Sequence, residues 1–229
     1  MKKTKIIRAA AILMLLAMVA TAFVGCKKSD AKLIVGKWQT TVNIEKALGD
    51  ELQEMTDELG SIDLSDITLT VNIEFKEDGT YTAGIDKASG QEAVDKMFAA
   101  MTPVITDMFK TQLAGELEKD PSEITDEMLN ELLAQAGMPY TSIQGFIDYL
   151  KADVDTDEMF NEAASEGKYI LKDGKIYMSD SLEEEATENS DATKYEFADA
   201  TTLKLEPDNQ DDVPEGMKDL LPLTFKKVG

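Results

Sequence analysis

The sequence predicts a mainly β protein of the α+β class, in which eight antiparallel strands are interrupted by a block of three to four helices. Two patterns predict this architecture. Apolar and polar residues alternate with period two in 36–86 and in 166–229, which indicates strands with one buried face. Between them, in 87–165, apolar residues recur every three or four positions, which indicates amphipathic helices.

The N-terminal β region is expected to contain three strands. The first begins at Gly36, the second covers 67–75, and the turn Glu77-Asp78-Gly79 leads into the third, which ends near Ile85. Between the first two strands, 46–60 has the apolar spacing of a helix. The apolar face of the three strands consists of Trp38, Thr40, Val42, Ile44, Ile67, Leu69, Val71, Ile73, Phe75, Tyr81, Ala83 and Ile85.

The helical insertion begins near Lys87 with a long amphipathic helix, for which we expect a kink at Pro103. Asp120-Pro121 ends it, and a second helix covers 128–136 with Gly137 as its stop signal. A capping box at 141–144 predicts a third helix, and a short fourth helix is expected over 157–165.

The C-terminal β region begins with a hairpin of 168–171 and 175–178 around Asp173-Gly174. Three further strands are expected, at 194–197, 202–205 and 223–228, with acidic loops at 183–191 and 206–215 between them. Eight antiparallel strands can close into a barrel and so remove exposed edges. An open sheet packed on the helices is the alternative.

The N-terminus has the layout of an export signal. Residues 1–8 are basic, 9–23 are apolar without a charge, and Val24-Gly25-Cys26 follows. This layout resembles the lipobox of bacterial lipoproteins, in which the peptide is cut before the cysteine and the thiol carries a diacylglyceryl group. The resemblance implies a signal peptide at 1–25, lipidated Cys26 with a tether at 26–35, and attachment to the extracytoplasmic face of the cell membrane or outer membrane. An uncleaved N-terminal anchor is the alternative.

The first strand carries Gly36-Lys37-Trp38, and the two Asp-Gly hairpins follow the same pattern of short strands and tight turns. This pattern is similar to the Gly-x-Trp signature of lipocalin-like families. The resemblance implies an eight-stranded lipocalin-like barrel formed by 36–86 and 166–229. Trp38 would pack across its base, and Gly36 would let the chain pass close by. The insertion at 87–165 departs from ordinary lipocalins.

Composition excludes several function classes. Without 1–25 the chain has 19 Lys and Arg against 45 Asp and Glu, a net charge of −26, which disfavours nucleic acid and anionic lipid. It contains no His and, apart from Cys26, no Cys, which removes thiol nucleophiles and Cys/His zinc sites. Asp153, Asp155 and Asp157 have the first spacings of a calcium loop, but Glu158 and Ala164 stand where Gly and Glu are needed. No catalytic residue, cofactor or metal site is predicted.

Three hypotheses of function remain from the sequence. In the first, a monomeric lipid-anchored protein binds a small apolar or amphipathic ligand, for which Met97, Met101, Met108 and Phe109 form a possible apolar groove. In the second, the barrel is filled with side chains and the helical insertion is a surface for a partner protein. Hydrolysis by two carboxylates is a third hypothesis, but no local motif supports it.

Overall fold

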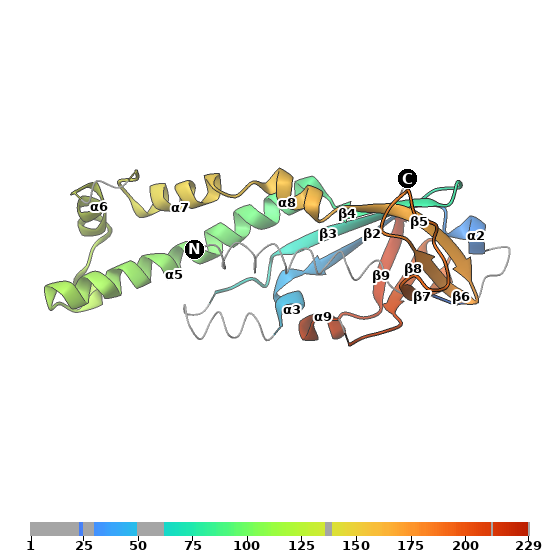
Figure 1. Ribbon diagram of the computed structural model, residues 1–229. Helices are drawn as coiled ribbons and strands as arrows, with labels where there is room; N and C mark the ends of the chain where they lie inside the picture. Colours follow the sequence, from blue (N-terminus) through green and yellow to red (C-terminus); the bar gives the residue numbers. More distant parts are fainter. Residues whose placement is uncertain (1–22, 25–29, 50–61, 136–138, 212, 229) are drawn as a thin grey trace.

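A β-barrel and a long helical arm make up the protein (Figure 1). The computed structural model describes residues 23–24, 30–49, 62–135, 139–211 and 213–228. The barrel lies at one end of the molecule. Helices α5 to α8, which we call the helical arm (87–162), project from it.

The barrel is closed by eight antiparallel strands, so the prediction of a closed barrel is confirmed and the open sheet is excluded. The strand order is β6-β5-β4-β3-β2-β9-β8-β7, and β7 pairs again with β6. A short strand outside this ring, β1 (Phe23–Val24), pairs with Gly174 and Lys175 of β6. The eight strands are β2 (Gly36–Asn43), β3 (Thr68–Phe75), β4 (Thr80–Ile85), β5 (Ser165–Lys172), β6 (Gly174–Met178), β7 (Ala192–Asp199), β8 (Thr202–Pro207) and β9 (Leu223–Val228).

The period-two pattern of the sequence explains the interior of the barrel. Paired residues of neighbouring strands point to the same face, and Trp38 of β2 lies opposite Ile73 of β3, which lies opposite Ala83 of β4. On the other side, Leu203 of β8 lies opposite Phe225 of β9. All five side chains are buried. They belong to one continuous hydrophobic core.

Tight turns fix the register of the hairpins. Asp173 (φ 50°) and Gly174 (φ 80°) both have positive φ, as a two-residue turn between β5 and β6 requires. In the turn before β4, Asp78 Oδ1 accepts hydrogen bonds from the backbone N–H and the hydroxyl of Thr80, at 3.0 and 2.7 Å. The two Asp-Gly signals of the sequence therefore lie where the chain reverses.

The helical arm begins with α5 (Lys87–Leu117), whose 31 residues span about 46 Å. The helix continues through Pro103 and ends at Glu118, which is left-handed. The chain then turns through a 3₁₀ helix (η2, Pro121–Glu123) into α6 (Asp126–Gln135) at the far end of the arm. Helices α7 (Ile143–Ala152) and α8 (Thr156–Glu162) return along α5 toward the barrel (Figure 1).

Three short helices lie at the two ends of the barrel. Helix α2 (Asp30–Leu33) is at the end away from the arm, and α3 (Ile44–Leu48) and α9 (Glu215–Lys218) are at the end from which the arm projects (Figure 1). We call these the α2 end and the arm end. Residues 30–33 were expected in a tether but form α2, because Ile34 is fully buried and holds this segment against the barrel.

Other boundaries differ from the sequence prediction by small amounts. Helix α3 ends at Leu48, and the rest of the helix predicted over 46–60 lies outside the described residues. The N-cap of α7 is Ser142 and not Thr141, because its Oγ accepts the backbone N–H of Gly145 at 3.0 Å. Helix α9 was not predicted, since four residues are too few to show a period.

Candidate functional site

The α2 end of the barrel is closed around Trp38, whose side chain has no exposed surface. Its Nε1–H donates to the carbonyl oxygen of Ile34 at 2.6 Å. Lys227 Nζ lies 5.0 Å from the centroid of the indole ring and donates to the carbonyl oxygen of Leu33 at 2.9 Å. Gly36 has a φ of 129°, and a Cβ there would lie 2.7 Å from Lys227 Cε. Gly36 and Trp38 of the Gly-x-Trp motif therefore lie at the start of the first strand of the barrel.

Helix α2 is held to this end by a second polar contact. The hydroxyl of Tyr195 on β7 donates to Asp30 Oδ2 at 3.0 Å. The ring of Tyr195 meets that of Phe197 at a centroid distance of 5.4 Å, and Phe197 meets Trp38 at 5.9 Å. Aromatic rings and α2 together seal the α2 end.

The barrel strands contribute many large, buried side chains to one hydrophobic core. Among the described residues, Thr193 Oγ1 is the one buried side-chain polar atom without a hydrogen-bond partner. The largest side chains with less than 2% exposure that the barrel strands contribute to the core are Trp38, Val71, Ile73, Phe75, Tyr81, Ile176, Leu203 and Phe225. Large buried residues thus come from β2, β3, β4, β6, β8 and β9 alike.

Two tyrosines of the barrel are bound through their hydroxyls to backbone carbonyls. Tyr81 donates to Ser179 O at 3.0 Å, and Tyr169 donates to Lys76 O at 2.9 Å. Burial raises the pKa of Tyr81, and burial with the nearby charge of Asp78 raises the pKa of Tyr169 to about 12. Both phenols are neutral structural groups at physiological pH.

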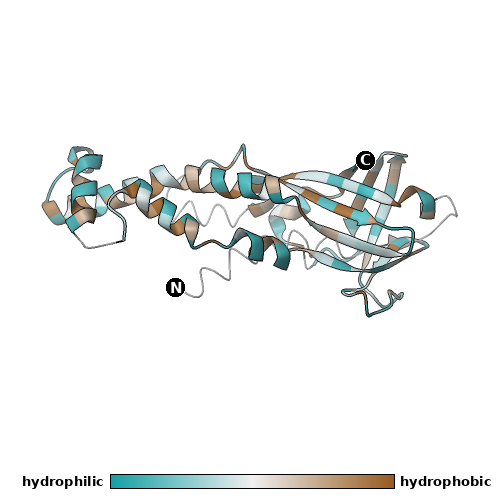
Figure 2. Ribbon diagram, turned by 90° about the horizontal axis from the view of Figure 1, so that it is seen from above, coloured by the Kyte–Doolittle hydropathy of each residue, from teal (hydrophilic) through white to brown (hydrophobic). Residues whose placement is uncertain are grey.

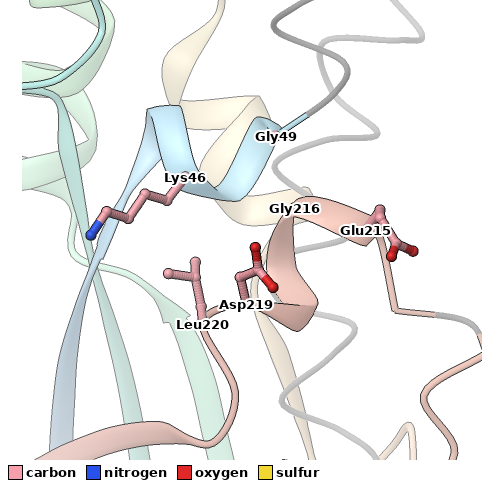
Figure 3. Close-up of a pocket in the computed structure, with 6 residues that line it drawn as sticks. All are labelled: Lys46, Gly49, Glu215, Gly216, Asp219 and Leu220. Atoms are coloured by element: carbon pink, nitrogen blue, oxygen red, sulfur yellow. The ribbon is translucent and has the colours of Figure 1, made fainter.

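A pocket of about 430 Å³ lies at the arm end of the barrel, between α3 and α9 (Figure 3). Three of its six lining residues are charged, and Lys46 and Glu215 extend in opposite directions from it (Figure 3). The two helices meet through glycines, because a Cβ on Gly49 would lie 2.6 Å from Gly216 Cα. The other lining residues are Asp219 and Leu220. No sequence signal pointed to this pocket, since its two walls are 166 residues apart.

The predicted apolar groove divides into two faces of α5. Met97, Met101, Val104 and Met108 follow at helical spacing and form one row, which we call the methionine stripe. Met108 is 49% exposed, and the other three are half-buried. Phe109 points elsewhere, because its ring packs against Phe146 of α7 at 5.6 Å. The three methionines are therefore together, and Phe109 belongs to the internal packing of the arm.

The arm has its own aromatic and aliphatic packing. Tyr140 meets Phe146 at 4.8 Å and Tyr149 at 5.8 Å, which ties α7 to the segment before it. Figure 2 shows hydrophobic and hydrophilic residues side by side along the whole arm. Among the described residues of the arm, the exposed large apolar side chains are Met108, Leu117, Leu132 and Tyr149.

Two of the acidic residues with calcium-loop spacing, Asp155 and Asp157, lie at the N-terminus of α8. Asp155 is the N-cap of α8 and accepts the backbone N–H of Glu158 at 2.8 Å. Asp157 pairs with Lys87 at 2.7 Å. Within the part of the chain that the structure describes, no cluster of three acidic or thiol ligands could hold a metal ion.

The acidic loops are bound to lysines on the outside of the barrel. Asp208 lies 2.8 Å from Lys175 and 3.3 Å from Lys194, and these contacts hold the pKa of its carboxyl below the usual range. Lys168 pairs with Glu185, and Lys172 pairs with Glu188. These ion pairs join both acidic loops to lysines of the barrel strands.

Comparison of the chain with protein-family models, curated proteins and solved structures finds no match. Cys26, the predicted lipidation site, lies outside the described residues. Within 23–24, 30–49, 62–135, 139–211 and 213–228, no helix has both the length and the hydropathy of a membrane span.

Proposed function

We propose that this protein is an exported, lipid-anchored lipoprotein of the cell envelope that works by interaction and not by catalysis. In this account the closed barrel is a filled, lipocalin-like pedestal, and the helical arm is the surface for a partner. The lipobox-like sequence that ends at Cys26 supports the anchor. The observation that carries the choice between the two hypotheses is the packed barrel interior around Trp38 and Phe75.

The topology supports this arrangement. Helix α2 begins four residues after Cys26, and the arm projects from the end of the barrel opposite to α2 (Figure 1). A lipid on Cys26 would therefore bring the α2 end toward the membrane and direct the arm away from it. Cleavage before Cys26 would remove β1 without opening the barrel, because β6 and β7 pair directly.

A small-molecule binder is the second candidate, and one observation favours it. The pocket between α3 and α9 has a volume within the range of ligand sites, about 300–1,000 Å³. Its lining includes Lys46, Glu215 and Asp219, so it suits a polar ligand better than the apolar molecule expected from the sequence.

The anchor is tested by a Cys26→Ala variant expressed in its own host. We expect wild type in the membrane fraction and the variant in the soluble extracytoplasmic fraction, because a lipidated cysteine supplies more than one buried chain. Equal membrane partition of the variant would show that lipid on Cys26 is not the anchor.

The orientation is tested with a fluorophore on an engineered cysteine, which would be the one free thiol once Cys26 is lipidated. Asp78 lies in the turn after β3, which is at the α2 end because Phe75 pairs with Gly36 at the start of β2. Gly115 lies in the last turn of α5, the end of the helix far from the barrel (Figure 1). In liposomes with quencher-labelled lipid, we expect quenching of a label at Asp78→Cys and none at Gly115→Cys. Equal quenching at both positions would contradict the proposed orientation.

A further inference from the structure

We propose that the start of β6 is a docking site for an extended apolar segment of a partner protein. In the structure this place is occupied by the chain's own strand β1, in which Phe23 pairs with Lys175 and Val24 pairs with Gly174. We call Gly174 and Lys175 the β6 edge. The inference rests on the proposed function, because cleavage before Cys26 removes Phe23 and Val24 and leaves the β6 edge without this strand.

The β6 edge lies where the two strands that close the barrel separate. The ladder between β6 and β7 covers 175–177 and 192–194. Beyond this ladder, residues 196–199 of β7 pair with β8 alone among the strands that the structure describes. Within the same part of the chain, Gly174 has its one ladder partner in Val24. An unpaired strand edge presents a row of backbone N–H and C=O groups, with which an extended segment can pair.

The residue types of β1 and the surroundings of the β6 edge both favour an apolar segment. The backbone of β1 lies near β7 and β5 as well as β6. Beyond the end of the β6–β7 ladder, β7 carries Tyr195 and Phe197, which are half-buried and whose ring centroids lie 5.4 Å apart. Phe23 and Val24 are of the aromatic and β-branched types that strands favour. A segment of the same residue types therefore suits the place that cleavage vacates.

The charges of the β5–β6 hairpin are balanced by its ion pairs, so they do not select a charged segment. Asp208 lies 2.8 Å from Lys175 and 3.3 Å from Lys194. Three positive and three negative groups belong to the turn and these pairs: Lys172, Lys175, Lys194, Asp173, Glu188 and Asp208. Because their sum is zero, a neutral apolar segment meets no unpaired charge among them.

Other occupants suit the β6 edge less well. A second mature copy would lack residues 23–24, as the first copy does. A hydrocarbon chain, including one on Cys26, has no N–H or C=O groups with which to pair a strand. An extended peptide supplies both the backbone pairing and the residue types of β1.

The inference is tested in solution with residues 26–229 carrying Cys26→Ser, so the result does not depend on the anchor. The probe is an end-blocked peptide with the sequence of residues 19–25, and NMR titration measures its binding. One control peptide has serine in place of Phe23 and Val24, and the other has methyl groups on the backbone nitrogens of these two residues. We expect the probe to bind and both controls to bind at least tenfold more weakly, because the first lacks the residue types and the second lacks the backbone donors.

Matched chains test whether the peptide and β1 use the same place. Residues 19–229 with Cys26→Ser retain β1, so we expect this chain to bind the peptide at least tenfold more weakly than 26–229 does. The same chain with Phe23→Ser and Val24→Ser should bind the peptide as well as 26–229. Hydrogen exchange of 26–229 should show protection by the peptide at 174–175 and 196–199.

Several results would each overturn the inference: no binding of the peptide to 26–229, equal binding of either control peptide, equal binding to 19–229, protection elsewhere, or dimers of 26–229 that are protected at the β6 edge. None of these results changes the membrane partition of Cys26→Ala. Failure of the docking site and failure of the anchor are therefore distinguishable.

Discussion

At the residue scale, Gly36 and Gly115 differ in backbone conformation and in the space that a Cβ would have. Gly36 has a φ of 129° and lies against Lys227, whereas a Cβ on Gly115 of α5 would meet open space. We expect Gly36→Ala to lower the free energy of unfolding by about 1–3 kcal/mol. Gly115→Ala should raise it by up to about 1 kcal/mol, because alanine favours the helix. Urea unfolding of both variants measures this contrast, and equal changes would contradict it.

Asp199 makes the turn between β7 and β8 sensitive to acid. Hydrogen bonds from the hydroxyl and backbone N–H of Thr201 and from the hydroxyl of Thr202 lower the pKa of its carboxyl to about 2. A lowered pKa in the folded state means that the stabilisation is present above pH 3.8 and is lost as the pH falls toward 2. Asp199→Ala should therefore shift the urea midpoint more at pH 7 than at pH 2. An equal shift at both values would exclude this cause.

Tyr169 makes the stability of the barrel sensitive to high pH. Burial raises the pKa of its phenol to about 12, so the stabilisation is present below pH 10 and is lost as the pH rises toward 12. Absorbance at 295 nm during titration measures phenol ionisation. Tyr169→Phe should remove amplitude near pH 12 and leave the curve below pH 10 unchanged. Loss of amplitude below pH 10 would show that Tyr169 is not shielded.

At the element scale, the contact between Gly90 of α5 and Phe160 of α8 fixes the base of the arm. A Cβ on Gly90 would lie 2.5 Å from Phe160 Cζ, and Phe160 is buried. Phe160→Ala leaves a cavity that should cost about 3–5 kcal/mol locally. Hydrogen exchange should become faster in α7 and α8 and remain unchanged in β3 and β8. Faster exchange throughout the barrel would show that arm and barrel unfold together.

Most of these elements could be predicted from period and turn chemistry. The alternation in β3 and the helical spacing in α5 each reflect one face turned to a core, and Asp173-Gly174 supplies the positive φ of its hairpin. Helices α2 and α9 could not be predicted, because each has four residues and is held by distant contacts, such as Tyr195 with Asp30. The sequence also does not separate Met108 from Phe109. Their separation depends on the contact of Phe109 with Phe146 of α7, which is distant in the sequence.

At the scale of the whole molecule, the barrel and the arm differ in shape and surface. The barrel is closed, Trp38 and α2 lie at one of its ends, and its strands contribute large buried side chains to the core. The arm is long, acidic and partly apolar on its surface, and it leaves the barrel from the end opposite to α2. The sequence predicted both parts, but the contents of the barrel depend on how eight strands meet, which no local pattern determines.

The most direct test of the central claim is the intact native mass of the protein purified from its own host. A lipid-anchored pedestal with a filled barrel predicts the mass of residues 26–229 plus the acyl chains on Cys26, with no further molecule bound. A co-purified small molecule would contradict the filled barrel and favour the ligand-binding hypothesis. A mass that retains residues 1–25 would contradict the lipidated anchor.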